Sequence, residues 1–249
     1  MNQTSNLSLN THYAKVIVNG DDWGIMNIEE HFSKEFLEKK QKKESLIFRF
    51  SDDRKWKNYE KSSDNVFASY LLSDSRLHGT FYNSKRYLED EYYRKVYSYV
   101  MQERLLENHS YLYSTKKHME LFYASLLWNS FHTLADHNTK YYFNPYTLEL
   151  SPISSDQDIF TDLNSNFVNS LKDHDFNLNF RQIFKFSINE DNNDKFILNS
   201  LNGIKDAENY LNKFKEIFPL DEYKEVSILE KNQKKVISSK ENILELSLI

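Results

Sequence analysis

Side chains that could bind a metal ion or move a proton gather in two short stretches in the middle of the sequence. In chain order they are His132, Asp136, Asn138, Asp156 and Asp158. Carboxylate and amide oxygens are hard ligands that suit Mg²⁺ or Mn²⁺ better than zinc. A histidine or carboxylate beside them could accept a proton from a hydroxyl group. Such a set fits phosphoryl transfer, which needs a divalent ion and nucleotide phosphates. The same residue types also serve as helix caps and turn formers.

These side chains can meet only if the surrounding elements fold the chain back on itself. Apolar residues at helical spacing predict a largely buried helix over residues 115–135. On that helix His132 and Asp136 are four residues apart and share a face. A hairpin over residues 141–150, with Pro145 in its turn, then returns the chain to the two later aspartates.

The N-terminal part of the sequence predicts strands and one short helix. Residues 14–30 predict two strands joined by an Asn-Gly turn, and the second strand is expected to be buried on at least one side. Ser33 is the expected cap of a helix that ends in the lysines of residues 39–43. Residues 46–50 predict a short buried strand that carries Arg49.

The remaining elements are predicted to be helices, one over residues 87–106 and three after residue 164. We therefore expect an α+β fold that is mainly helical and has three parts. Residues 1–50 would form the hairpin, helix and strand. Residues 51–163 would form a helical core that holds the candidate metal and catalytic segment, and residues 164–249 a C-terminal helical region.

Composition excludes several other classes of protein. The chain has 249 residues, no cysteine and 4 glycines, where average usage would give roughly 17 glycines. Without cysteine there is no disulfide scaffold, thiolate zinc site or cysteine nucleophile. The spacing of the glycines builds neither a GxGxxG loop nor a Walker A loop. A net charge of −5 is too mild to indicate a polyanion-binding surface, so no nucleic-acid partner is expected.

No run of about 18 apolar residues predicts a membrane span, and the polar first residues do not resemble a secretory leader. We therefore expect a cytoplasmic chain by default, with its oligomeric state open. Aromatic residues make up 15% of the chain. Their helical spacing predicts core packing rather than stacking on bases. The lysines of residues 39–43 lie among glutamates and predict a solvated helix end rather than a nucleic-acid patch.

Two blocks of the sequence resemble the CotH family of spore-coat-type atypical protein kinases. The first, residues 16–50, reads VIVNGDDWGIMNIEEHFSKEFLEKKQKKESLIFRF. It is similar to the family's NGxxWG hairpin with a closing glutamate, followed by a helix and an LYK strand. The second, residues 124–158, reads ASLLWNSFHTLADHNTKYYFNPYTLELSPISSDQD. It is similar to the family's DxxxxNYYLY segment and later PxDxD. The two blocks occur in the family's order and at similar spacing.

The resemblance implies the C-terminal part of a protein-kinase-like fold, with ATP and Mg²⁺ as cofactors and a protein as the phosphorylated partner. It implies metal ligands at Asn138, Asp156 and Asp158. It places Glu30 at the glutamate that ends the hairpin block and Arg49 where the family has the lysine of LYK. Both are therefore candidate cofactor-binding residues.

The sequence also departs from the family pattern. The family's catalytic aspartate lies five residues before the metal-binding asparagine, where this chain has Thr133, so that Asp136 or His132 is the candidate base. Arg49 stays protonated and has a forked guanidinium head, so it is not an equivalent replacement for lysine. Relatives carry a much longer segment before the hairpin, and we expect this chain to lack most of the N-terminal lobe.

The leading hypothesis is therefore a CotH-like kinase that transfers a phosphoryl group from ATP to a protein Ser or Thr. The alternative is a pseudokinase or fragment that acts as a non-catalytic binding module. A third hypothesis is a metal-dependent glycosyltransferase, because Asp156 and Asp158 also match a DxD motif.

Overall fold

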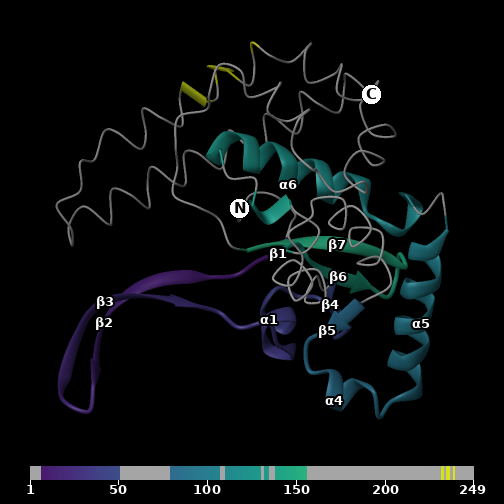
Figure 1. Ribbon diagram of the computed structural model, residues 1–249, viewed down its shortest axis with the longest axis horizontal. Coiled ribbons are helices and arrows are strands. Elements are labelled where there is room, and N and C mark those ends of the chain that lie inside the picture. Colours follow the sequence, from purple (N-terminus) through teal and green to yellow (C-terminus); the bar gives the residue numbers. More distant parts are fainter. Residues whose placement is uncertain are drawn as a thin grey trace, which may run out of the picture.

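The protein was analysed as a computed structural model, which describes residues 7–50, 79–106, 110–129, 132–134, 138–155, 231, 232, 234, 235 and 238. At its centre is a five-stranded sheet in the order β1-β7-β6-β4-β5, and a separate ribbon, β2-β3, projects away from it (Figure 1). The strands of the sheet are β1 (Leu7–Ser8), β4 (Ile47–Phe50), β5 (Gly79–Phe81), β6 (Lys140–Asn144) and β7 (Glu149–Ser154). β1 is parallel to β7, and the other neighbours are antiparallel.

Helices lie on both sides of this sheet. In chain order they are α1 (Lys34–Lys39), α4 (Ser84–Tyr87), α5 (Glu91–Leu105) and α6 (Thr115–Trp128), with 3₁₀ turns η2 (Ser110–Leu112) and η3 (His132–Leu134). In Figure 1 α6 runs above the sheet and α1 lies below it, while α5 stands at its right. The sheet is therefore the middle layer of the described structure.

The prediction of a mainly helical fold is wrong, although the fold is α+β. Helices account for 39% and strands for 34% of the residues that can be interpreted. Along β4, β6 and β7 both faces of the sheet carry buried side chains. A sheet with two buried faces takes the centre of the core, and helices serve as its cover. Of the region after residue 164, where three helices are predicted, only residues 231, 232, 234, 235 and 238 are described, and they are helical.

The face of the sheet that α5 and α6 cover is aromatic. Phe48 and Phe50 of β4 and Tyr141 and Phe143 of β6 are almost completely buried there. The ring of His118, from α6, stacks on Tyr141 with 5.8 Å between ring centroids. These large rings bury much of the apolar area on this face, and Leu46, Val96, Val100, Leu112 and Leu150 belong to the same cluster.

The opposite face of the sheet packs against α1. Ile47, Tyr142 and Ile153 form one buried cluster with Phe36 and Leu37 of that helix. Ile47 and Tyr142 are directly opposite each other on neighbouring strands, so their side chains lie on the same face. We call this the α1 face of the sheet.

The helix predicted over residues 115–135 begins where expected and ends seven residues early. α6 stops at Trp128, and Asn129 adopts a φ of 50°. Asparagine tolerates this left-handed conformation, which commonly ends a helix. A 3₁₀ turn at residues 132–134 follows instead of a further helical turn. His132 thus lies in this turn rather than on α6, and Asp136 lies outside the described residues.

Short-range predictions elsewhere agree with the structure. Ser33 caps α1 by accepting a hydrogen bond from the backbone N–H of Phe36 at 3.3 Å. The hairpin of β6 and β7 forms, and the side chain of Asn144 accepts a hydrogen bond from the N–H of Tyr146 in its turn.

The helix predicted from residue 87 starts later, because Asp90 caps α5 by accepting a hydrogen bond from the N–H of Tyr92.

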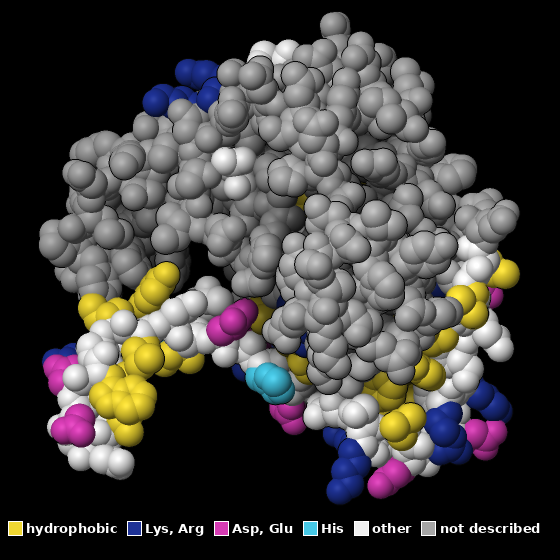
Figure 2. All heavy atoms as spheres, in the orientation of Figure 1, with side chains coloured by type: hydrophobic (Ala, Val, Ile, Leu, Met, Phe, Trp, Pro, Cys, Tyr) yellow, Lys and Arg dark blue, Asp and Glu magenta, His cyan; other side chains and the backbone are white. Residues whose placement is uncertain are grey.

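The ribbon consists of β2 (Thr11–Val18) and β3 (Asp21–Glu29). Asn19 and Gly20 both have positive φ angles, as a two-residue hairpin turn requires. The expectation that the second strand is buried on one side is wrong, because most of β3 is exposed. Figure 2 shows hydrophobic side chains along the projecting ribbon. They include Tyr13, Ile17, Trp23, Ile25, Met26 and Ile28.

Candidate functional site

The candidate site lies at one end of the α1 face, where β4, β6 and β7 run side by side. Arg49 of β4 is directly opposite Lys140 of β6 and also opposite Thr80 of β5. Lys140 is in turn opposite Ile153 of β7. Residues directly opposite each other share a face of the sheet, with Cβ atoms about 5 Å apart. Two cationic side chains therefore stand next to each other on this face.

Arg49 lies on the α1 face because it is two residues from Ile47, which belongs to the cluster packed on α1. Its side chain is partly buried. Burial raises the pKa of Tyr82, and the charge of Arg49 acts against this rise. The ring of Tyr82 packs against Phe32 with 4.7 Å between centroids. Arg49 thus lies next to the apolar cluster that packs on α1, two residues beyond Ile47.

Asn138 lies at the same end of the sheet. It comes two residues before Lys140, while Ser155 comes two residues after Ile153, and Lys140 pairs with Ile153. If this antiparallel register continued by two residues, Asn138 would lie opposite Ser155. The chain then leads directly to Asp156. The hairpin therefore brings the Asn138 end of β6 to the end of β7 from which the two aspartates follow.

The 3₁₀ turn that carries His132 is attached to this end of β6. The buried hydroxyl of Thr139 donates a hydrogen bond to the backbone carbonyl of Thr133 at 2.7 Å. Thr139 is the residue between Asn138 and Lys140. This contact keeps the backbone of the turn next to the start of β6.

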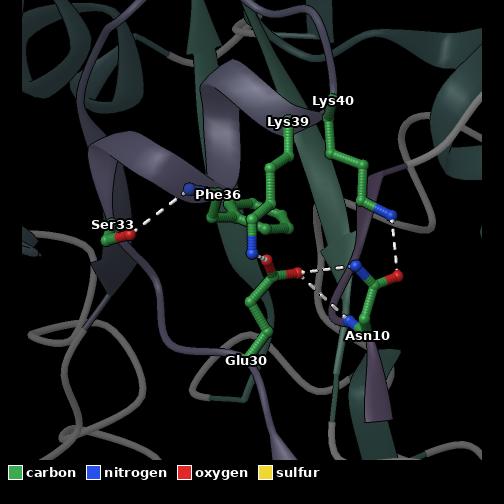
Figure 3. Close-up of polar contacts among 6 residues, drawn as sticks. All are labelled: Asn10, Glu30, Ser33, Phe36, Lys39 and Lys40. Carbon is green, nitrogen blue, oxygen red and sulfur yellow. Dashed lines mark hydrogen bonds and ion pairs between the residues drawn. The ribbon is translucent and has the colours of Figure 1, made fainter.

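The carboxylate of Glu30, a predicted cofactor-binding residue, connects the end of the ribbon to Asn10 and to α1 (Figure 3). One oxygen accepts hydrogen bonds from the backbone and side-chain nitrogens of Asn10, at 3.3 and 3.0 Å. The other binds the Nζ of Lys39 at 2.9 Å. Lys40 Nζ in turn donates to the Asn10 side chain at 3.1 Å. The described side-chain contacts of Glu30 thus run to Asn10, between β1 and β2, and to α1, and none of them goes to Arg49.

The surroundings of Glu30 favour its charged form. Burial by itself would raise the pKa of this carboxyl. Hydrogen bonds from Lys39 and Asn10, together with the charges of Lys39 and Lys40, lower the pKa below its ordinary value. The carboxylate is therefore ionised wherever this clamp is closed. We call the group Asn10, Glu30, Lys39 and Lys40 the ribbon clamp.

The other predicted site residues are only partly covered by the structure. The backbone of His132 lies in η3, and its side chain is not described. Asp136, Asp156 and Asp158 lie outside the described residues. Within the parts of the chain that are described, no three His, Asp or Glu side chains form a group that could hold a metal ion.

Sequence reasoning missed Lys140. The residue is the first of β6 and comes two positions after Asn138, which lies in a turn before this strand. The sequence shows that Lys140 is close to Asn138. It does not show that Lys140 is next to Arg49, because β4 is far away in the sequence. Only the register of β4 with β6 places a second cation beside Arg49.

The described elements define an α+β domain with a mixed sheet covered on both faces and a projecting ribbon. In comparisons with known proteins, no protein-family model and no curated protein matches the chain. No described helix combines the length and apolar character needed to cross a membrane.

Proposed function

We propose that this protein is a CotH-like kinase that transfers the γ-phosphoryl group of ATP to a protein Ser or Thr with the help of Mg²⁺. The observation that carries the proposal is the register of β6 with β7. It supports a site in which Asn138 lies near the end of β7 that continues into Asp156 and Asp158. An amide and two carboxylates in one place are suitable oxygen ligands for Mg²⁺.

The residues present fit that metal by their chemistry. Asn138, Asp156 and Asp158 would hold the ion, which when bound neutralises charge on the phosphates. Arg49 and Glu30 differ in what they could contribute. Arg49 carries a permanent positive charge on the α1 face, whereas Glu30 is engaged in the ribbon clamp and would act by holding the ribbon.

The base that accepts the proton of the protein hydroxyl is either Asp136 or His132. The hydrogen bond from Thr139 to the backbone of Thr133 supports His132, because it keeps the η3 turn beside Asn138. Asp136 is supported by its position in sequence, two residues before Asn138. The two variants Asp136→Asn and His132→Gln distinguish these roles by which one abolishes transfer.

A non-catalytic nucleotide-binding module is the second candidate. It is favoured by two observations, the presence of Arg49 where the family has lysine and the engagement of Glu30 with Asn10 and Lys39. An arginine has a forked, more diffuse charge than lysine. Such a protein would bind ATP without transferring its phosphate.

The test is transfer of labelled phosphate from ATP. The full chain is incubated with γ-labelled ATP, Mg²⁺ and casein as acceptor, and label on the chain itself and on casein is measured. We expect label on Ser or Thr with the natural sequence and none with Asp156→Ala. Glu91→Ala is the matched control, because this exposed α5 carboxylate pairs only with Lys95 among the described contacts. It should transfer normally.

Three outcomes separate the hypotheses. Transfer that requires Asp156 supports the kinase. ATP binding without transfer to casein, to the chain itself or to water overturns the kinase and supports the binding module. Binding of a sugar nucleotide without binding of ATP overturns both and supports the DxD-type glycosyltransferase.

A further inference from the structure

We propose that the protein forms a homodimer in which β3 pairs with β3 of a second copy. The two ribbons would join into one four-stranded antiparallel sheet around a two-fold axis at Asn27. This inference concerns assembly and goes beyond the proposed function, because it does not depend on ATP binding or on phosphoryl transfer.

The outer edge of β3 is open and largely apolar. Within the described part of the chain β3 pairs with β2 alone, and every residue of β3 except Gly24 is exposed. Trp23, Ile25 and Met26 are 58%, 51% and 40% exposed. An edge strand presents backbone N–H and C=O groups on which a further strand can form. Two strands alone are marginally stable in water, so further strands would stabilise the ribbon.

The outer edge of β2 is less suited to such pairing. Ala14, Val16 and Val18 of β2 are partly covered. Lys15 places a permanent charge in the middle of the strand, and a lysine on an edge strand opposes pairing with another chain. Residues 25–28 of β3, in contrast, carry no charged side chain.

A bulge limits the part of β3 that can pair. Val16 is opposite Gly24 and Ile17 is opposite Asp22, which leaves Trp23 as the extra residue of β3. Gly24 has a φ of 76°, and its N–H donates to the Asp22 side chain at 2.9 Å. A bulge bends its strand and disrupts regular pairing. The regular part of β3 therefore consists of residues 25–29.

One hydrogen bond shows which backbone groups of this part face outward. Residues directly opposite each other in antiparallel strands alternate between pairs that exchange hydrogen bonds and pairs that do not. The N–H of Glu30 donates to the carbonyl of Asn10 at 2.9 Å, directly next to the paired residues Thr11 and Glu29. Glu29 therefore belongs to a pair that does not exchange hydrogen bonds. By alternation, the residues of the regular part that direct their N–H and C=O groups to the outer edge are Ile25, Asn27 and Glu29.

One antiparallel register of two β3 strands pairs all three of these residues with one another. A two-fold axis at Asn27 places this residue opposite its own copy, and Ile25 opposite Glu29 of the second copy. Such pairs exchange two hydrogen bonds each, which gives about six backbone hydrogen bonds across the interface. On the other side of the sheet, Met26 faces Ile28 of the second copy as an apolar pair.

The charges along β3 favour the same register. With the axis at Asn27, no two like charges are directly opposite, and two uncharged amides that can donate and accept face each other. An axis at Ile25 would place Glu29 opposite Asp21 of the second copy. An axis at Glu29 would place two carboxylates together. Like charges directly opposite each other are unfavourable, so backbone pairing and charge select the same axis.

The first measurement is sedimentation equilibrium of the full natural chain. We expect a reversible monomer–dimer equilibrium with a Kd of roughly micromolar order, as suits a small contact. In the dilute monomer the amide hydrogens of the ribbon should exchange quickly, and exchange in residues 25–29 should slow severalfold as the dimer forms. A chain that stays monomeric up to about 100 μM would overturn the proposal.

The second measurement uses the position of Asn27 opposite its own copy. Asn27→Lys and Asn27→Asp should each weaken dimerisation roughly tenfold, because each puts two like charges opposite each other. A mixture of the two variants should dimerise again, since opposite charges then face each other. Thr11→Lys is the matched control, because it adds the same charge on β2 and should dimerise normally. Normal dimerisation of the single variants, or a mixture that stays monomeric, would overturn the register.

The third measurement reads the register through disulfide formation, which is specific because the chain has no cysteine. Met26 and Ile28 of two copies would form a pair with Cα atoms about 4.5 Å apart, within reach of a disulfide. A mixture of Met26→Cys and Ile28→Cys should form covalent heterodimers roughly tenfold faster than a mixture of Met26→Cys and His12→Cys. His12 is opposite Ile28 on β2, one strand farther from the second copy. Equal rates would count against β3 pairing in this register.

Other occupants of this edge give different results. A natural chain that stays monomeric leaves β3 open to a strand from a different protein, and the second copy is then the wrong partner. A dimer that is unaffected by charge at residue 27 and shows equal disulfide rates is built on another surface, and β3 pairing falls. Neither result bears on ATP·Mg²⁺ binding, which is tested separately through Asp156→Ala.

Discussion

Glu30 shows how one side chain can link three elements. From the residue after β3, its carboxylate joins Asn10, directly before β2, to Lys39 at the C-terminal end of α1. Phe36 and Leu37 on the same helix are fully buried against the sheet. The ribbon is therefore connected to the core through a charged clamp and a helix that is itself anchored by apolar contacts.

The clamp predicts a specific dependence of stability on pH. Because the folded-state pKa of Glu30 is lowered from 4.5, its stabilising contribution is present above about pH 4.5 and is lost as the pH falls through the lower folded value. Glu30→Gln should cost about 1 to 3 kcal/mol at pH 6 and should lose less stability on acidification. Urea unfolding between pH 6 and 3 measures both.

Glu29→Gln is the matched control, because Glu29 is the exposed neighbour on β3. It should leave the unfolding free energy almost unchanged at pH 6. A Glu30→Gln protein with the same acid dependence as the natural sequence would contradict the role assigned to the clamp.

His118 predicts a second pH effect, of different origin. Burial lowers its pKa to about 4, against a hydrogen bond between Nδ1 and the Ser114 carbonyl at 2.8 Å that raises it. The unfolded chain takes up a proton near pH 6.5 that the folded chain takes up only near pH 4. Stability is therefore lost as the pH falls through this window, by up to ~3 kcal/mol in total.

The measurement is the slope of the unfolding free energy between pH 6.5 and 5, in the natural sequence and in His118→Gln. The variant should be less stable overall but have a shallower slope, by up to about 1.4 kcal/mol per pH unit. His12→Gln, at an exposed position of β2, should keep the original slope. Parallel slopes for His118→Gln and the natural sequence would count against a neutral buried His118.

At the scale of elements, the features set by neighbouring residues were predictable. The Asn-Gly turn, the Ser33 cap and the β6–β7 hairpin all follow from a few adjacent side chains. The end of α6 was missed because Asn129 leaves the helix in the middle of an apolar stretch. The exposure of β3 was missed because alternation gives the two faces of a strand but not what covers them.

The ribbon should be the least protected of the described strand pairs. Two strands without a further strand or a helix on a face are marginally stable in water, and β2 and β3 are largely exposed. Hydrogen-exchange mass spectrometry should show faster exchange for residues 11–29 than for residues 140–154. Equal protection of the two hairpins would contradict the structure of the ribbon.

Gly20→Ala supplies a variant for the same measurement. Gly20 has a φ of 92°, which a side chain makes costly. The substitution should speed exchange further in residues 11–29 and leave residues 140–154 unchanged, because the two hairpins are separate sheets.

At the scale of the whole molecule, the sheet decides which residues can act together. Arg49 and Lys140 come from strands that are distant in sequence, and only the register of β4 with β6 makes them neighbours. The periodicity within each segment does not show which remote strand it pairs with. The sequence therefore indicated Arg49 and Asn138 as site residues but not Lys140. The same distance explains the wrong prediction of a mainly helical fold, because pairing of remote strands leaves little local trace.

We propose that ATP·Mg²⁺ binds at the end of this sheet, where Asn138 comes two residues before β6 and the two aspartates follow β7 in the sequence. The most direct measurement is calorimetric titration of the full chain with ATP·Mg²⁺. We predict a single binding site in the natural sequence and in Glu91→Ala, and loss of binding in Asp156→Ala and when EDTA removes the metal. Absence of binding to the natural sequence, or binding that survives Asp156→Ala unchanged, would contradict it.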